Sequence, residues 1–254
     1  MLPRERTVLP AGADVTGVSK IPRMSDNPFG TATTSSKQSA LSVFEPRATE
    51  RAASSTFLLG QVMFLVAVAL AFTSAGAYIG RDLSYGTGLI FELCAFGMLI
   101  VQMFVPVLRE GPTGMTWMFA LALLLGLGLG PVINEYATVD QSAIYQAAGG
   151  TALTVGVMGS YGFATSRDMI RWMRPLFFAL LGVFVLSIVL ILIGSGEHFL
   201  LNLAIYVIVS AYLAIYFQII RRKATERDVI WIATGVFINV INIFLTLLRI
   251  FGGR

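Results

Sequence analysis

The sequence is poor in charge and in cysteine. Of its 254 residues only 13% are charged and 56% are hydrophobic, whereas soluble domains carry roughly 25% charged residues. This composition excludes an ordinary soluble domain and indicates a membrane protein. Cys94 is the sole cysteine and lies inside an apolar run, so an internal disulfide framework and a cysteine-ligated zinc are both excluded.

The residue patterns of common catalytic sites are also missing. His198 is the only histidine and lies in the short junction "GSGEHF", so the histidine pair of a metalloprotease cannot be built. "MGSYGF" lacks the spacing of a nucleophile elbow, and "GLGLGP" lacks the lysine of a phosphate loop. No apolar run holds the paired aspartates of an intramembrane protease. We therefore expect no enzyme activity, no cofactor and no bound metal.

Basic residues exceed acidic ones, with 18 Lys and Arg against 14 Asp and Glu. Such an excess can indicate nucleic-acid binding when it forms one continuous patch. Here the basic residues are scattered over the N-terminal segment and the short junctions between apolar runs. We therefore expect the lipid bilayer, and not a nucleic acid, to be the main partner.

The chain divides into a polar segment and a series of apolar runs. Residues 1–56 are rich in Ser, Thr, Pro and Ala without a sustained apolar period, which predicts a disordered cytosolic N-terminal tail. Residues 57–254 hold seven runs, each near the ~20 residues that a helix needs to cross a bilayer. The runs are 57–79, 86–108, 116–133, 143–165, 176–194, 199–220 and 229–251. The prediction is an all-α integral membrane domain of seven transmembrane helices.

The basic residues also predict the orientation. With the N-terminus inside, fifteen of the eighteen Lys and Arg fall on cytosolic segments, as the positive-inside rule requires. Seven crossings then place the C-terminus outside. An even number of crossings, with a re-entrant last run, is the competing topology.

Small residues give two packing expectations. A small residue recurs every four positions in the run 143–165, which predicts a face for close helix contact and a place near the bundle centre. This ridge consists of Ala148, Ala152, Gly156, Ser160 and Ala164. In the run 116–133, Gly126, Gly128 and Gly130 are expected to loosen the helix before Pro131.

The last run carries a polar stripe. Asn239, Asn242, Thr246 and Arg249 are separated by steps of three, four and three residues, so they share one face of a helix. Glu92 is the only carboxylate well inside an apolar run and falls in the same outer half of the bilayer as Arg249. We expect a Glu92–Arg249 pair or a hydrogen-bonded cluster with Asn242 or Thr246. It could act as a structural clamp, or as a gate or proton sensor.

Five stretches of the apolar runs and their junctions are distinctive: "IFELCAFGMLI", "GPVINEY", "AAGGTAL", "SYGFATSRDM" and "FINVINIFLTLLRIFGG". Together they resemble the Bax inhibitor-1 family of membrane proteins, in particular its bacterial YccA-like branch. The resemblance covers about residues 57–253. It implies a seven-helix fold in which six helices surround a central one.

The resemblance also implies a function and its sensor positions. Better-studied members are described as pH-sensitive calcium leaks that use an aspartate on each of the last two helices. The matching positions here carry Tyr216, in "IYFQ", and Asn239, in "FINVIN". Neither side chain titrates near neutral pH, and neither offers the anionic oxygen that calcium prefers. The pH-gated calcium mechanism is therefore not expected to apply intact.

Two functions remain as expectations. The first is a non-catalytic protein that regulates or accompanies another membrane protein or complex, such as the FtsH protease with which the YccA-like branch is associated. The alternative is a cation (calcium) leak channel that lacks the usual aspartate sensor. The bacterial character of the resemblance predicts the inner (cytoplasmic) membrane.

Overall fold

The structure, a computed structural model, describes residues 32–193 and 199–253, with side chains from Ser54 onward except at four positions of the fifth long helix, 184, 188, 191 and 192. Every regular element in this part of the chain is a helix. The longer helices are α1 (Ala32–Gly80), α2 (Tyr85–Phe104), α3 (Gly111–Val139), α4 (Gln141–Ala164), α5 (Met173–Leu192), α6 (Phe199–Arg222) and α7 (Val229–Gly252). The short 3-10 turns are η1 (Pro106–Arg109), η2 (Ile170–Trp172) and η3 (Glu226–Asp228).

The N-terminal segment differs in part from the expectation. The chain divides into two units, Met1–Pro46 and Arg47–Arg254, and the packing described below belongs to the second. Helix α1 begins at Ala32 and so includes residues 32–56 of the expected tail. Residues 1–31 lie outside the described part, and the separate tail stays a prediction.

Six helices of the described chain are long and apolar enough to cross a membrane. They are Ser54–Gly80 of α1, then α2, α3, Ile170–Ser187 over η2 and α5, α6, and Glu226–Gly252 over η3 and α7. The seventh expected crossing is α4, which has 24 residues. Its length suffices, but its Gly, Ser, Thr and Gln residues make it less apolar than the other six.

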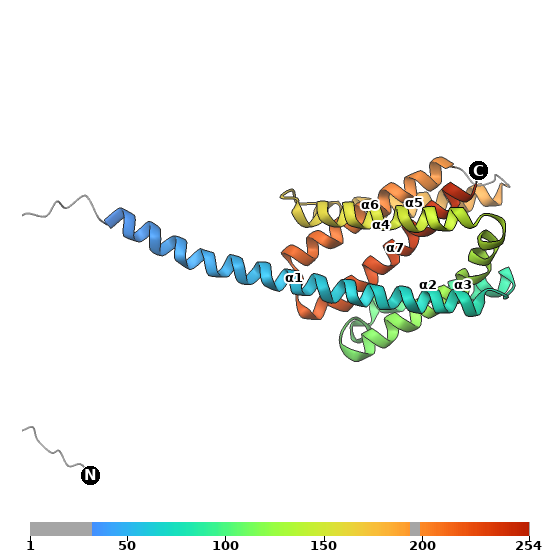
Figure 1. Ribbon diagram of the computed structural model, residues 1–254, viewed down its shortest axis with the longest axis horizontal. Helices are drawn as coiled ribbons and strands as arrows, with labels where there is room; N and C mark the ends of the chain where they lie inside the picture. The colour runs from blue at the N-terminus through green and yellow to red at the C-terminus, as the bar shows by residue number, and fades with distance from the viewer. Residues whose placement is uncertain (1–31, 194–198, 254) are drawn as a thin grey trace, which may run out of the picture. The chain divides into compact units, whose positions relative to one another are not determined.

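Helix α7 lies at the centre of the second unit. It contacts α3, α4 and α6, and in Figure 1 it runs between α1–α3 on one side and α4–α6 on the other. Fourteen of its residues are buried, including Phe237 and Ile243, which are fully enclosed. Such burial indicates that α7 holds the two groups of helices together.

The glycines of α3 are packing positions and do not loosen the helix. Helix α3 continues through Pro131 to Val139. A Cβ at Gly126 would collide with the backbone of Thr73 on α1, and one at Gly130 would collide with the backbone of Gly80. Thr73 also donates a hydrogen bond to the Ala122 carbonyl across this contact (3.1 Å). The expectation failed because backbone-to-backbone packing depends on which element approaches, not on local flexibility.

Helix α4 packs through a different face from the one expected. The ridge from Ala148 to Ala164 is exposed along its whole length. The face that contacts α6 and α7 carries Ala143, Ala147, Thr151, Thr154, Gly159 and Gly162. At Gly162 the Ala214 backbone of α6 leaves no space for a Cβ. Both faces are rich in small residues, so spacing alone could not distinguish them.

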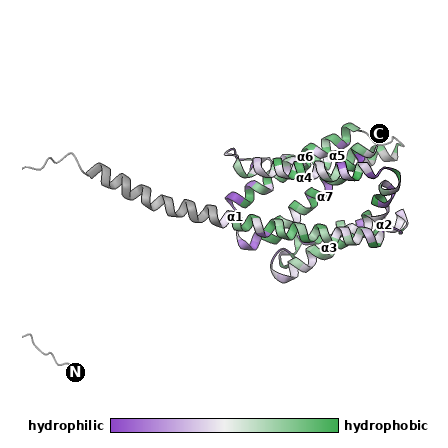
Figure 2. Ribbon diagram, in the orientation of Figure 1, coloured by the Kyte–Doolittle hydropathy of each residue, from purple (hydrophilic) through white to green (hydrophobic). Residues whose placement is uncertain are grey.

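Helix α5 lies at the periphery. Its described side chains include no buried residue, and it packs mainly against α6. Figure 2 shows that the helices are largely hydrophobic along their lengths. The apolar surface of α5 therefore faces the surroundings of the protein and not its core.

Candidate functional site

Glu92 lies in the middle of α2, against α3. Its Cγ atom occupies the space beside Gly128, where a Cβ would be only 2.6 Å away. The side chain is half-buried. The structure thus places Glu92 between α2 and α3.

The polar stripe of α7 is only partly turned inward. Asn239 and Thr246 are buried, whereas Asn242 and Arg249 are exposed on the second unit. The Thr246 hydroxyl donates to the Asn242 carbonyl of the same helix (2.7 Å). This bond satisfies the hydroxyl donor within α7, so Thr246 needs no partner from α2.

The two positions that the resemblance assigns to aspartates meet at one glycine. The Tyr216 ring lies on Gly235 of α7, where a Cβ would be 2.5 Å from the phenol oxygen. The Asn239 amide donates to the Gly235 carbonyl (2.7 Å). We call Tyr216, Gly235 and Asn239 the Gly235 site. Its two polar side chains are neutral, and the aromatic ring fills the space at the glycine.

The expected polar cluster is therefore divided into two places. Asn239 and Arg249 are ten residues apart on α7, which corresponds to roughly 15 Å along a helix. The Gly235 site lies nearer the N-terminus of α7, whereas Glu92 lies on α2 against Gly128 of α3. The spacing of polar residues along a helix shows that their side chains point to the same side. It does not show that these side chains are close to one another, which is why one cluster was expected.

Sequence reasoning missed a clamp at the end of α6. Gln218 is fully buried; its amide donates to the Arg167 carbonyl (2.5 Å) and its oxygen accepts from the Met169 N–H (2.7 Å). Arg221 donates to the Thr165 carbonyl (2.5 Å) and Arg222 to the Ser166 carbonyl (2.6 Å). These three α6 side chains hold the α4–α5 connection. The sequence feature that could have predicted this contact is Gln218 in "IYFQ", a polar residue in an otherwise apolar run.

A second missed contact joins the α2–α3 connection to α7. The Arg109 guanidinium lies 4.7 Å from the centroid of the Trp231 ring. It also donates through Nε to the Gln102 carbonyl (2.8 Å). The cation–π contact links the start of α7 to η1, where the Gln102 side chain donates to the Leu108 carbonyl (3.1 Å).

One hydrogen-bonded carboxylate lies between two helices, outside the six apolar spans. Asp140 caps α4. Hydrogen bonds from the Ser142 hydroxyl (2.6 Å) and from the N–H groups of Ala143 and Ser142 hold the pKa of the Asp140 carboxyl below its usual value. These donors favour the ionised form.

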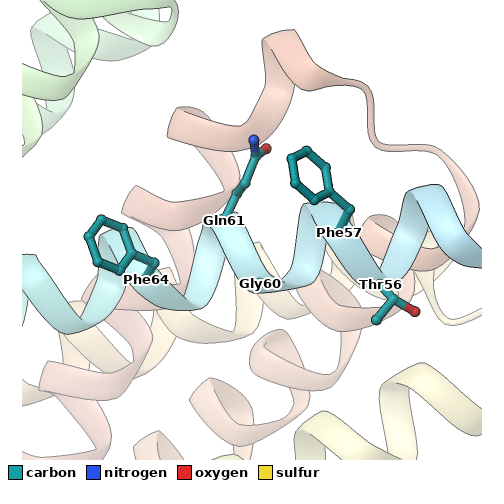
Figure 3. Close-up of a pocket in the computed structure, with 5 residues that line it drawn as sticks. All are labelled: Thr56, Phe57, Gly60, Gln61 and Phe64. Carbon is teal, nitrogen blue, oxygen red and sulfur yellow. The ribbon is translucent and has the colours of Figure 1, made fainter.

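An open hollow on α1 offers little chemistry. Phe57, Gln61 and Phe64 project from one side of the helix, while the Thr56 side chain points to the opposite side (Figure 3); Gly60 also lines the hollow. None of these side chains titrates. Among the described residues, moreover, no three His, Cys, Asp or Glu side chains gather to hold a metal ion.

The helices and the central α7 define a class, an all-α multi-pass membrane protein. The family described as "Inhibitor of apoptosis-promoting Bax1" matches residues 55–254. The chain belongs to this Bax inhibitor-1 family.

Relatives in bacteria support this assignment. An uncharacterized membrane protein of Vibrio cholerae is 26% identical over 198 residues, covering 77% of this chain and 86% of the relative. The "Modulator of FtsH protease YccA" of Escherichia coli K12 is 28% identical over 205 residues, covering 77% and 89%. An uncharacterized membrane protein of Streptococcus pyogenes is 30% identical over 171 residues, covering 62% and 73%. These names describe membrane proteins and a protease modulator, and none describes an enzyme.

Proposed function

We propose that the protein is a non-catalytic regulator that acts by contact with another membrane complex, a membrane-bound protease of the FtsH type. The observation that carries this proposal is the neutral Gly235 site. Tyr216 and Asn239 hold no proton that is lost near neutral pH, and the ring of Tyr216 packs on Gly235. A pH-operated cation gate at this position lacks its titrating groups.

The name of the Escherichia coli relative supports the choice of partner. It also supports a bacterial inner membrane as the location, since the same protein of a second strain is named an inner membrane protein. In this proposal α4 is the seventh crossing, six helices surround α7, the N-terminus is cytosolic and the C-terminus is outside. The small residues of α4 suit a helix that is covered by protein on one side.

Reconstitution with a purified protease tests the function. An FtsH-type protease and a membrane substrate would be placed in proteoliposomes with increasing amounts of this protein, and the loss of substrate followed over time. We expect the degradation rate to change with stoichiometric addition, while an equal amount of an unrelated multi-pass protein has no effect. An unchanged rate at every ratio would refute the proposal.

Chemical labelling tests the seven crossings. In two separate variants of the Cys94→Ala protein, a single cysteine would replace Thr138, in the last turn of α3 before α4, or Ser166, just after α4. If α4 crosses the membrane, an impermeant thiol reagent labels one of the two positions in intact cells and leaves the other unlabelled. Labelling of both or neither, with full reaction after solubilisation, would show that α4 does not cross.

A cation leak is the second candidate, and Glu92 is the observation in its favour. The carboxylate-bearing side chain is half-buried between α2 and α3, so it could serve as a gate. Calcium flux into proteoliposomes at mildly acidic and mildly alkaline pH tests this candidate. Flux in wild type that Glu92→Gln abolishes would favour the leak. Flux only in the double variant Tyr216→Asp with Asn239→Asp would show a scaffold that lacks its sensor.

A further inference from the structure

The α6 clamp gathers basic side chains from two connections at one end of the second unit. Gln218, Arg221 and Arg222 bind the backbone of residues 164–169, so the α4–α5 and α6–α7 connections lie together. We call the basic residues of these segments the basic patch. It consists of Arg167, Arg171, Arg174, Arg221, Arg222, Lys223 and Arg227.

Seven basic residues stand against three acidic ones in these segments, Asp168, Glu226 and Asp228, so the basic patch keeps a net positive charge. Within the described residues, Arg167, Arg171 and Arg174 form no ion pair, the pair found there being Arg81–Asp82. Asp168 accepts a hydrogen bond from the Ile170 N–H (3.2 Å). Asp228 accepts from the hydroxyl (2.7 Å) and the N–H (3.0 Å) of Thr225. These two carboxylates are occupied with local backbone structure, and the exposed guanidinium groups remain available to an external anion.

An apolar track begins directly at the patch. Phe178, Leu181 and Val185 follow Arg174 at four, seven and eleven residues, so all four lie on one face of α5. The three apolar side chains are 68%, 47% and 52% exposed. Eleven residues of helix rise by roughly 16 Å, which is close to half of the ~30 Å hydrocarbon thickness of a bilayer.

Trp172 lies at the same level as the charges. Its side chain is 55% exposed between Arg171 and Arg174, at the start of a helix with no buried residue among its described side chains. Exposed tryptophan is enriched at the boundary between headgroups and acyl chains. Trp172 and the guanidinium groups of Arg171 and Arg174 thus lie together at one end of the apolar track, as headgroup-level side chains lie at one end of the acyl chains in a lipid leaflet.

We propose that Arg171 and Arg174, supported by the rest of the basic patch, bind the phosphate of an anionic phospholipid whose acyl chain lies along Phe178, Leu181 and Val185. The favoured ligand is a lipid of net negative charge such as phosphatidylglycerol. Guanidinium groups suit phosphate oxygens in charge and geometry. The apolar track distinguishes a lipid from an acidic protein segment, which would require no exposed hydrocarbon beneath the charges. The proposal does not depend on the proposed function.

Lipid selectivity in proteoliposomes tests the proposal. Electron spin resonance with spin-labelled phosphatidylglycerol and phosphatidylcholine measures the relative association of each lipid with the full chain. We expect wild type to prefer phosphatidylglycerol. The double variant Arg171→Gln with Arg174→Gln should lose most of this preference, about fivefold for each charge that contacts the headgroup.

Two variants separate binding from folding and from general charge. Arg171→Lys with Arg174→Lys keeps both charges and should keep most of the preference. Arg81→Gln removes a charge that is already paired with Asp82 and should leave the preference unchanged. Equal association of both lipids with wild type, or an unchanged preference in the double Gln variant, would overturn the proposal.

Two soluble competitors at constant ionic strength separate the sources of the anion. Inorganic phosphate and a polyglutamate peptide should both leave the bound phosphatidylglycerol signal nearly unchanged, because neither occupies the apolar track. Displacement by inorganic phosphate would mean a free-anion site. Displacement by polyglutamate alone would mean a protein-binding surface. Either result would refute lipid binding as the role of this patch.

Discussion

Helices α5 and α7 are both apolar and of membrane-spanning length, yet α7 lies at the centre of the second unit and α5 at its periphery. Helix α7 carries two asparagines, two threonines and an arginine and has fourteen buried residues. Helix α5 is apolar throughout most of its length and has no buried residue among its described side chains. In a bilayer, lipid tails are as apolar as leucine, so apolarity does not drive a helix into the core. Packing and polar groups distinguish a central helix from a peripheral one.

The largest difference in stability between the two helices is expected when one aromatic ring is removed from each. Phe237 on α7 is fully buried, whereas Phe178 on α5 is 68% exposed. We expect Phe237→Ala to lower the free energy of unfolding by about 3 kcal/mol, because it leaves a cavity. Phe178→Ala should lower the free energy of unfolding by a much smaller amount, because its side chain is already exposed. Unfolding in mixed micelles, followed by tryptophan fluorescence, measures both, and equal losses would contradict the assignment of α7 as the core.

Two glycine-to-alanine substitutions test the difference between a packed and a peripheral helix by adding a single methyl group. On α4, a Cβ at Gly162 would collide with the Ala214 backbone, while on α5 Gly182 has no atom within 4 Å of that position. We expect Gly162→Ala to destabilise the protein by about 2 kcal/mol through overpacking. Gly182→Ala should be neutral or stabilising by up to ~1 kcal/mol, because alanine favours the helix. Changes of the same sign in the two variants would show that α5 is packed more closely than the structure indicates.

The α4–α5 connection is held in place by hydrogen bonds from side chains of α6. Gln218→Leu removes the hydrogen bonds to Arg167 and Met169 and leaves two part-buried backbone groups without these partners. We expect a loss of about 1–2 kcal/mol and faster trypsin cleavage after Arg167. Gln146→Leu, at an exposed position of α4, is the matched control. Equal cleavage rates in wild type and Gln218→Leu would argue against the clamp.

The smallest expected effect concerns the start of α4. Because hydrogen bonds lower the pKa of Asp140 in the folded state, its contribution to stability is present above its unfolded pKa of about 3.9. That contribution is lost as the pH falls through the folded value. Asp140→Ala should slightly lower the unfolding temperature at pH 7 and leave a smaller difference at pH 3. A difference between the two proteins that stays constant from pH 7 to pH 3 would rule out the cap as its source.

Much of the helix content was predictable from the sequence, but the helix contacts were not. The apolar runs anticipate the helices, and only α4 falls short of the apolarity of a membrane span, owing to the small and polar residues that let it pack. The ridge of α4 was assigned to the wrong face, and the α3 glycines were given flexibility where the structure shows close approach. Tyr216 and Asn239 could be picked out by resemblance. Their meeting at Gly235 could not, because it needs the relative position of α6 and α7.

By itself, the sequence determined that the chain is a helical membrane protein, since hydrophobic composition and the length of the apolar runs reflect a lipid surrounding. The sequence also showed no recognisable set of catalytic residues. Only the tertiary structure decided which apolar helix is central, which glycines face a neighbouring backbone, and which residues of the polar stripe of α7 are buried. The physical reason is that lipid tolerates any apolar face. The choice among faces then depends on side-chain packing and on hydrogen bonds between segments that are far apart in the chain.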